Sequence, residues 1–316
     1  MAVTVRAVHP SEFEQLYDLL WRSFERHYLR DARDYFSPFY EKDPFMDEEL
    51  VRVVRADGGG LAASVTIFDR TVLIEGRPVR MGGIGNVATH PEHRGKGLAG
   101  LLLDDCVELM KKKGFGVSLL FAGPVPLYEK HGWMSLDAFS WDFSGLKPPA
   151  VERGLSVRPV SWSSERLEVY NLHKGFIQRH NFPTDRNMAY WNNYVWEFKD
   201  RHCDLIGVFR SDELLAYAIV DHDWKESSTW LKELCCTTGD AIPAVVDHLM
   251  KKYGTRRIRF SGSGRDNPVV VFLKSVAGET AEEPQKGFMA RNINSDFDMG
   301  SARFCGKLLH FSGDDF

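Results

Sequence analysis

The stretch VATHPEHRGKGLAGLL, residues 87–102, decides the fold. A segment of β-type residues runs into a proline, and the loop RGKG at 94–97 then alternates two basic residues with glycines. The apolar spacing that follows predicts a helix over 98–113, which Gly114 ends. A helix N-terminus has unpaired backbone N–H groups and carries about half a positive charge. Because glycines let an anion approach the backbone closely, the stretch predicts a phosphate or pyrophosphate site.

Other interpretations of this loop can be weighed from its spacing. RGKG by itself is also compatible with a solvated turn whose charges keep it soluble. A Walker A loop is excluded, because Lys96 is followed by Gly97 and not by Ser or Thr. Gly95, Gly97 and Gly100 have the G-x-G-x-x-G spacing of a dinucleotide-binding turn. That turn is excluded as well, because PEHR separates the glycines from the strand and no acidic residue ends a following strand about 20 residues on.

The order of elements repeats along the chain. Strand-like segments between 50 and 90 lead to the glycine loop, its helix, the buried strand GVSLLFAG at 116–123 and the short helix PLYEKHGW at 126–133. The sequence LMKKKG at 109–114 returns as LMKKYG at 249–254, each time at the end of a helix and before an apolar strand. Together with the matching order of elements, this echo predicts an internal duplication.

Three pieces of the first half carry a resemblance to a known family. VATHPEHRGKGLAGLLL resembles the Arg/Gln-x-x-Gly-x-Gly/Ala segment of the GCN5-related N-acetyltransferases, the GNAT superfamily, and that motif falls on Arg94, Gly97 and Ala99. GGIGNVAT, residues 82–89, stands where the family has its fourth strand. PLYEKHGW is similar to the family's YxxxGF ending, in which a tyrosine opens the helix after the fifth strand.

The spacing of LLFAGPVPLYEKHGW is similar to that of the Eis-like branch, the enhanced intracellular survival acetyltransferases. These proteins join an active GNAT domain to a second GNAT-like domain. The resemblance implies an α/β fold with mixed sheets, built as tandem GNAT folds of which the first is active and the second degenerate. We place the first domain at 1–145, a proline- and glycine-bearing linker at 146–156, and the second domain at 157–316.

The resemblance also implies acetyl-coenzyme A as co-substrate. In the family, the glycine loop grips the pyrophosphate and the fourth strand holds the pantetheine and the thioester. The implied cofactor-binding residues are Val87, Ala88, Thr89, Arg94, Gly95, Lys96, Gly97, Leu98 and Ala99.

Tyr128 is the expected general acid. A phenol with a pKa of about 10 can protonate a departing thiolate whose pKa is about 8.5; spacing alone would equally allow Tyr128 to pack under its helix. Many relatives place a glutamate base on the fourth strand, but MGGIGNV at 81–87 has none. Eis-like chains also have a third, sterol-carrier-like domain whose terminal carboxylate reaches the site, and the final GKLLHFSGDDF is too short for that domain. The general base, including the carboxylate of Phe316, is left open.

The second copy is expected to have no cofactor site. Aligning LMKKYG on LMKKKG places 234–237, Leu-Cys-Cys-Thr, opposite the glycine loop, and Pro268 opposite Tyr128. We expect this copy to pack aromatic residues such as Trp191, Trp196 and Trp230 within its core or against the first domain, and to wall the acceptor pocket of the first.

Metal and redox chemistry are not expected. His90 and His93 form an H-x-x-H that is not the helical i, i+4 pair and has no evident third ligand, so we interpret both as loop residues beside the cofactor. The five cysteines have no CxxC spacing and are expected to be reduced. The adjacent Cys235 and Cys236 could indicate redox chemistry, but a buried strand explains them better.

The composition of the chain limits the classes of partner that it is expected to bind. The chain has 316 residues, 43% of them apolar and 27% charged, which is typical of a globular protein with two domains. A net charge of -4 gives no general footprint for nucleic acid or a membrane surface. No apolar run is long enough to cross a membrane, and the N-terminus lacks the pattern of a signal peptide, so we expect a cytoplasmic location. Homo-oligomerisation is left open.

Two functions follow as hypotheses. The first is an acetyl-CoA-dependent N-acetyltransferase acting on a small-molecule or peptide amine. The second is a GNAT-fold module that binds acyl-CoA as a regulatory ligand without turnover. The acceptor cannot be read from the sequence; the loop FYEKDPFMDEEL, residues 39–50, could attract a polycationic amine, although a solvated acidic loop is the simpler interpretation.

Overall fold

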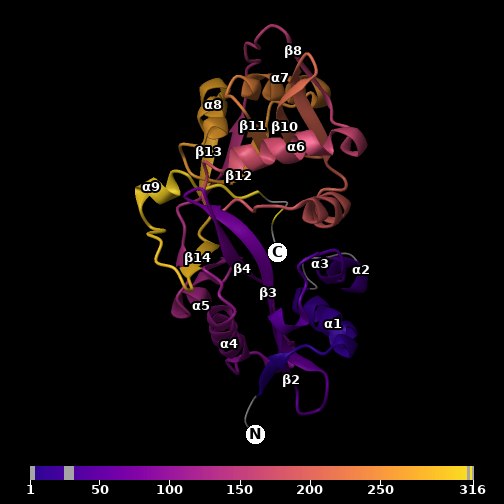
Figure 1. Ribbon diagram of the computed structural model, residues 1–316, viewed down its shortest axis with the longest axis vertical. Coiled ribbons are helices and arrows are strands. Elements are labelled where there is room, and N and C mark those ends of the chain that lie inside the picture. The colour runs from indigo at the N-terminus through magenta and orange to yellow at the C-terminus, as the bar shows by residue number, and fades with distance from the viewer. Residues whose placement is uncertain (1–3, 25–31, 312–313, 315–316) are drawn as a thin grey trace.

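The computed structural model describes residues 4–24, 32–311 and 314. Two mixed sheets of seven strands each follow one another along the long axis of the molecule (Figure 1). From edge to edge, the first sheet contains β1 (Val5–Ala7), β2 (Val51–Arg55), β3 (Leu61–Ile74), β4 (Arg77–Thr89), β5 (Val117–Phe121), β14 (Phe288–Asn292) and β6 (Met134–Ser135). The second contains β13 (Glu279–Pro284), β7 (Phe139–Ser144), β12 (Ile258–Ser263), β11 (Ser228–Cys236), β10 (Glu213–Asp223), β9 (Asp204–Arg210) and β8 (Leu155–Pro159).

Helices cover these sheets. Those of the first half are α1 (Phe13–Phe24), α2 (Ala32–Phe36), α3 (Pro38–Glu41), α4 (Leu98–Lys112) and α5 (Val125–Lys130), with short 3₁₀ turns η1 (Pro10–Glu12), η3 (Glu48–Leu50) and η4 (Pro91–His93). Those of the second half are α6 (Trp162–Ile177), the π-helix η5 (Tyr190–Lys199), α7 (Ala241–Tyr253), α8 (Pro268–Val276) and α9 (Ala302–Cys305).

The strand orders reveal the duplication. Read from β1, the first sheet runs through β2, β3, β4 and β5, and read from β8 the second runs through β9, β10, β11 and β12. In each sheet one strand from the other half follows, and then β6 or β13 closes the edge. The mixed α/β architecture in two copies that the sequence predicted is therefore confirmed.

The two halves exchange one strand each, which the predicted domain boundaries did not anticipate. β7 lies between β12 and β13 in the second sheet, although the sequence analysis placed it in the domain 1–145. β14 lies between β5 and β6 in the first sheet, although it belongs to 157–316. The alternating burial of β7 shows that one of its faces is apolar, but alternation does not say which sheet a strand joins. Neither sheet is complete within one half of the sequence.

Opposite faces of the first sheet bury different helices. Leu16 and Leu20 of α1 share a core cluster with Val53 of β2, whereas Leu102 of α4 shares another with the next residue of β2, Val54. Because successive side chains of a strand point to opposite faces, α1 and α4 cover opposite sides of the sheet. This arrangement also agrees with the separation of α1 and α4 in Figure 1.

A buried arginine connects the first sheet to the second half of the chain. Arg70 of β3 donates from Nη2 to Asp43 Oδ2 at 2.7 Å and from Nε to the Tyr190 hydroxyl at 3.3 Å. Its guanidinium lies over the rings of Tyr190 and Tyr194, 4.7 Å and 5.0 Å from their centroids. Stacking and ion pairing together compensate the burial of this charge.

Two expectations about side chains of the second half have different outcomes. Trp191 is fully buried, as predicted, but Trp230 is 41% exposed and lies outside the core. The five cysteines are free, as predicted, and Cys235 is buried within β11.

Candidate active site

A β-bulge in β4 creates the site. Ser64 of β3 pairs with Ala88 and Thr66 pairs with Gly85, so Asn86 and Val87 together oppose a single residue of β3. Asn86 has a φ of +50°, a left-handed conformation that asparagine tolerates better than most residues. A bulge bends its strand and increases the local twist.

The bend separates β4 from β5. The two strands pair in parallel from Met81 with Val117 to Ile84 with Leu120, and beyond these residues they diverge. The split opens a cavity of about 630 Å³, a size typical of ligand sites. Its walls are Phe24, Tyr35, Phe36, Phe39, Ile84, Gly85, Asn86, Val87, Thr89, Arg94, Ala99, Phe121, Ala122, Gly123, Pro124, Leu127 and Tyr128.

The cavity brings together five of the ten residues that the sequence analysis assigned to the site. These are Val87, Thr89, Arg94, Ala99 and Tyr128.

The other five lie around the cavity and do not line it. Ala88 points into the core that packs against α1. Gly95, Lys96 and Gly97 are exposed on the loop before α4. Leu98 is buried under the opposite face of the sheet and anchors the first turn of α4.

The glycine loop has the predicted geometry. Gly95 and Gly97 have φ values of +77° and +76°, and Gly97 is the N-cap of α4. The N–H of Leu101 donates to the carbonyl of Gly97 at 3.1 Å, so the amides before it point out of the helix end. Arg94 donates from Nε to the carbonyl of Thr89 at 3.3 Å, which ties the loop to the end of β4. The result is a cationic helix N-terminus at the mouth of the cavity.

Two further glycines have a packing role. A Cβ on Gly100 would lie 2.8 Å from His131 Nε2, and a Cβ on Gly82 would lie 2.3 Å from Met110 Sδ. His131 is in turn held by Asp104, with 2.6 Å between Nδ1 and Oδ1. The third glycine of the G-x-G-x-x-G spacing thus allows α4 to approach the end of α5, and Gly82 allows α4 to lie close to β4.

Tyr128 is held at the C-terminal half of the short helix α5. Its carbonyl accepts the N–H of His131 at 3.0 Å and that of Trp133 at 3.1 Å, and its ring meets Trp133 edge-on. The side chain is only 6% exposed, and this burial raises the pKa of Tyr128 to about 12. The phenol therefore keeps its proton at neutral pH while lining the cavity.

A chain of polar contacts beside the bulge could not be predicted from the sequence. Asn86 Nδ2 donates to the Tyr40 hydroxyl at 2.9 Å, and that hydroxyl lies 3.0 Å from Thr66 Oγ1. Burial raises the pKa of Tyr40 to about 12. The only signal for Asn86 in the sequence was its place within the glycine-rich fourth strand, because the bulge depends on a backbone angle.

His90 and His93 lie just before the glycine loop, at the 3₁₀ turn η4. His90 Nδ1 accepts the N–H of Glu92 at 3.4 Å, and His93 Nδ1 lies 3.1 Å from Lys96 Nζ. Neither histidine lines the cavity.

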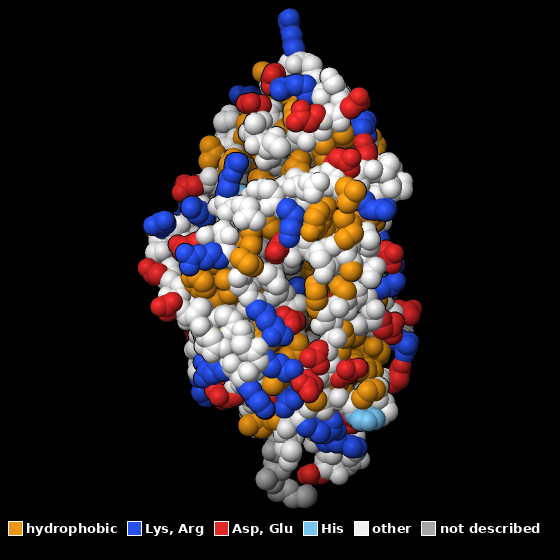
Figure 2. All heavy atoms as spheres, in the orientation of Figure 1, with side chains coloured by type: hydrophobic (Ala, Val, Ile, Leu, Met, Phe, Trp, Pro, Cys, Tyr) orange, Lys and Arg blue, Asp and Glu red, His pale blue; other side chains and the backbone are white. Residues whose placement is uncertain are grey.

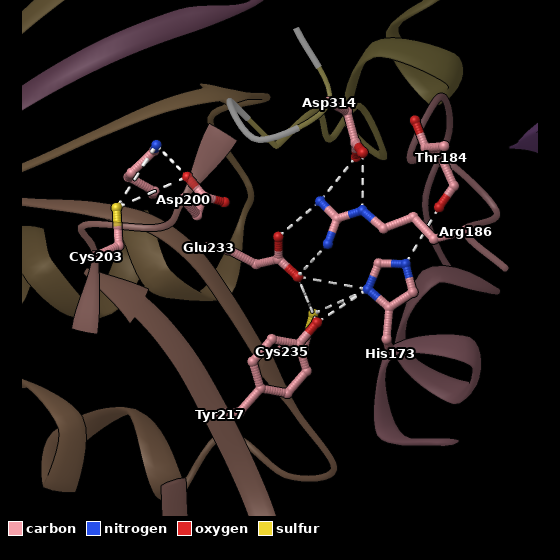
Figure 3. Close-up of polar contacts among 10 residues, drawn as sticks. His173, Thr184, Arg186, Asp200, Cys203, Tyr217, Glu233, Cys235 and Asp314 are labelled. Atoms are coloured by element: carbon pink, nitrogen blue, oxygen red, sulfur yellow. Dashed lines mark hydrogen bonds and ion pairs between the residues drawn. The ribbon is translucent and has the colours of Figure 1, made fainter. Parts of the chain in front are cut away.

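Two clusters in the second half have ligand atoms close enough together to hold a metal ion: His173, Glu233 and Cys235, and His202, Cys203 and Asp221. In the first, both oxygens of Glu233 already accept from Arg186, at 3.1 Å and 2.8 Å (Figure 3). The hydroxyl of Tyr217 also donates to Glu233. This carboxylate is therefore fully engaged by protein donors.

The loop of the second copy differs from the aligned one. Leu234 and Cys235 are buried strand residues and do not occupy the loop position, so that part of the alignment was wrong. The connection from β11 to α7 is only 237–240, Thr-Thr-Gly-Asp, against 90–97 in the first copy. It contains no basic residue, and its aspartate would repel a phosphate. In α8, the position four residues into the helix is Val271, whereas α5 has Tyr128 there.

On the face shown in Figure 2, Lys and Arg side chains are mixed with Asp and Glu. Among the described residues, no helix is long and apolar enough to cross a membrane.

Comparison with known proteins finds a family match in the first half of the chain. The sequence of residues 4–135 matches the acetyltransferase (GNAT) domain model. Residues 4–135 are therefore similar to GNAT acetyltransferase domains. The cavity, the glycine loop and Tyr128 all lie within these matched residues, and the GNAT fold supports acyl-CoA-dependent acyl transfer in general. No curated protein matches the sequence of the chain.

Solved structures share the fold of nearly the whole chain. A GCN5-related N-acetyltransferase from Anabaena variabilis is 18% identical with a TM-score of 0.75, over 93% of this chain and 73% of that one. Eis1 from Mycobacterium abscessus is 13% identical with a TM-score of 0.68, over 93% and 74%. The N-myristoyltransferase of Saccharomyces cerevisiae with bound myristoyl-CoA is 13% identical with a TM-score of 0.58, over 97% and 88%. At these identities the likeness is one of fold.

Proposed function

We propose that this protein is an acetyl-CoA-dependent N-acetyltransferase that moves an acetyl group directly onto an amine, with Tyr128 as the general acid. The observation that carries the proposal is the split between β4 and β5, because a single cavity joins Arg94 at the glycine loop to Tyr128.

The glycine loop suits a pyrophosphate. Arg94 and Lys96 are exposed cations, and a Cβ on Gly95 or Gly97 would meet nothing within 4 Å, so the space before the helix N-terminus is open. Outward amides, a helix dipole and two cations favour an anion there. We assign the pyrophosphate to residues 94–99 and the pantetheine arm to the edge of β4 at 87–89.

When bound, acetyl-CoA supplies its acetyl group as an activated thioester. The edge of β4 beyond Ile84 has no strand beside it on the β5 side, so backbone N–H groups at 87–89 can donate to the charge that develops on the carbonyl oxygen. Tyr128 then protonates the departing thiolate. Burial raises the pKa of Tyr128 to about 12, so the phenol holds its proton until the thiolate departs.

The proposal extends to the whole chain. We place it with the Eis-like proteins, as a cytoplasmic enzyme with one acetyl-CoA site per chain, no metal, and a second copy that walls the acceptor pocket. The likeness of fold to Eis1 and the loop Thr-Thr-Gly-Asp at 237–240 support this. The general base is left unassigned, and Phe316 lies outside the described residues.

Calorimetric titration with acetyl-CoA tests the site. We expect one site per chain, and Arg94→Ala should weaken binding by the loss of a charge-assisted contact, about 1.5–3 kcal/mol. Arg77→Ala, which changes an exposed arginine at the start of β4, is the matched control and should bind as the wild type does. Equal affinities of the two variants for acetyl-CoA would refute the assignment of Arg94 to this site. Two equivalent sites per chain would show that the second copy also binds acetyl-CoA.

One observation favours a second candidate, an acyl-CoA-binding module without turnover. Among the described residues, no Asp, Glu or His side chain lines the cavity. A thiol-release assay with a panel of amines separates the two functions. Release that depends on an amine supports the enzyme, whereas tight binding without release from any amine supports the module.

A further inference from the structure

The cavity wall away from the glycine loop is made of aromatic rings. Phe24 comes from α1, Tyr35 and Phe36 from α2, and Phe39 from α3. Tyr35 meets Phe36 edge-on with 4.9 Å between centroids, and Phe24 lies 6.1 Å from Phe36. Three consecutive helices thus present one continuous aromatic wall.

This wall lies on the other side of the split sheet from the proposed acetyl-CoA end. Arg94 and Ala99 belong to the loop and first turn of α4, which packs on one face of the sheet. Phe36 and Phe39 belong to the core cluster of α1, on the opposite face. A group reaching the thioester from this second side would contact rings.

The acidic loop does not supply a cation-binding wall. Asp43 is buried in its pair with Arg70, with both side chains at most 2% exposed. Asp47 and Glu49 both pair with Lys113, at 3.4 Å and 2.6 Å. These carboxylates are compensated by cations of the chain itself, and none of the three lines the cavity.

The amide of Asn86 provides a polar anchor among the rings. Its Nδ2 is turned toward the Tyr40 hydroxyl by the 2.9 Å hydrogen bond, and Thr66 holds that hydroxyl from the other side. Among the described residues no hydrogen bond to the other end of the amide, Oδ1, is found, so this oxygen can accept an N–H from an amine. An apolar wall with one oriented acceptor is the usual composition of a site for a small apolar ligand.

We infer that the acceptor is an amine carried on an apolar, ring-bearing body, and that the wall formed by Phe24, Tyr35, Phe36 and Phe39 binds that body. The inference rests on the proposed acetyl transfer. It favours an aryl-alkyl amine over a polycation, because edge-on and tilted rings stabilise an aromatic ligand, whereas a polyamine would lose hydration without gaining a carboxylate from the described lining of the cavity.

The test compares 2-phenylethylamine with spermidine in the wild type, Phe24→Ala and Phe24→Leu. Phe24 is half-buried, so both variants should fold. We expect 2-phenylethylamine to have the higher kcat/KM, and expect Phe24→Ala to lower it roughly ten- to a hundredfold, the effect of losing one buried aromatic contact. Phe24→Leu should lose less. Trp224→Ala, which removes a surface ring that is 72% exposed, is the matched control and should change nothing.

Two further arms separate this inference from the proposed function. Calorimetric binding of 2-phenylethylamine to the protein with coenzyme A should weaken in Phe24→Ala even if turnover is slow. In the last arm octanoyl-CoA replaces acetyl-CoA as the acyl donor, to test whether the aromatic wall binds the acyl chain and not the amine. Preference for spermidine, undiminished amine binding in Phe24→Ala, or faster transfer from octanoyl-CoA than from acetyl-CoA would overturn the inference and leave acyl transfer standing. Loss of acetyl-CoA binding itself would instead refute the proposed function.

Discussion

Replacing Arg186 with alanine should destabilise the protein strongly. Arg186 is completely buried and forms two bidentate pairs, with Glu233 at 3.1 Å and 2.8 Å, and with Asp314 at 2.8 Å and 2.9 Å (Figure 3). The substitution leaves both carboxylates buried without their cation. Removing one partner of a buried pair typically costs about 3–5 kcal/mol in the free energy of unfolding. The pair also holds residue 314, near the end of the chain, against β11.

The pKa of Glu233 determines how the loss of stability in Arg186→Ala changes with pH. Burial alone would raise the pKa of Glu233, but Arg186 and His173 lower it to about 2. An unfolded glutamate has a pKa of about 4.3, so this group stabilises the wild type above that pH, and the contribution is lost as the pH falls toward 2. In Arg186→Ala burial dominates and the pKa of Glu233 rises. Protonation then relieves the buried charge, so the deficit of the variant should shrink as the pH falls.

Urea unfolding measured at pH 7 and at pH 5 is the assay. Arg158→Ala is the matched control, because Arg158 forms a similar forked pair with Glu165 at the surface, with side chains 47% and 19% exposed. An exposed pair contributes little to stability, because solvent screens it. If Arg186→Ala costs no more than this control, or if its deficit grows as the pH falls, the account of the buried network is wrong.

Two other predictions concern packing and strand exchange. Gly100→Ala should lower the stability by roughly 1–3 kcal/mol, because the new Cβ would lie 2.8 Å from His131 Nε2, and a thermal melt that matches the wild type would contradict this. The fragment 1–145 should aggregate when expressed alone, because β5 and β6 lose β14 between them, and co-expression of 146–316 should restore a soluble complex. A monomeric, cooperatively unfolding fragment 1–145 would show that the exchanged strand is dispensable.

Much of the site could be predicted from local sequence. The glycine loop and the helix from Leu98 depend on neighbouring residues, and the structure shows both where they were expected. Tyr128 follows the fifth strand as expected, but it is the fourth residue of α5 and does not open that helix. The GNAT domain model matches the same part of the chain. Local patterns succeed here because capping, helical spacing and positive φ values are decided within a few residues.

What could not be predicted depends on distant parts of the chain. The alternating residues of β7 indicate a strand, but the exchange of β7 and β14 between the sheets is decided by which open edge each can reach. Asn86 became important only through the bulge, which requires that β3 and β4 differ by one residue in their register. The loop of the second copy was misaligned because the offset between LMKKKG and LMKKYG was applied without change along the chain. The connection before α7 is shorter than the connection before α4, so that offset does not hold there.

The most direct test of the proposed function is the turnover of Tyr128→Phe. We expect acetyl transfer to an amine to fall about 100- to 10,000-fold, the contribution of a general acid, while the affinity for acetyl-CoA stays close to that of the wild type. Tyr170→Phe, which removes the hydroxyl of a half-buried tyrosine on α6, is the control and should leave both unchanged. Turnover by Tyr128→Phe equal to that of the wild type would contradict the assignment of Tyr128 as the proton donor.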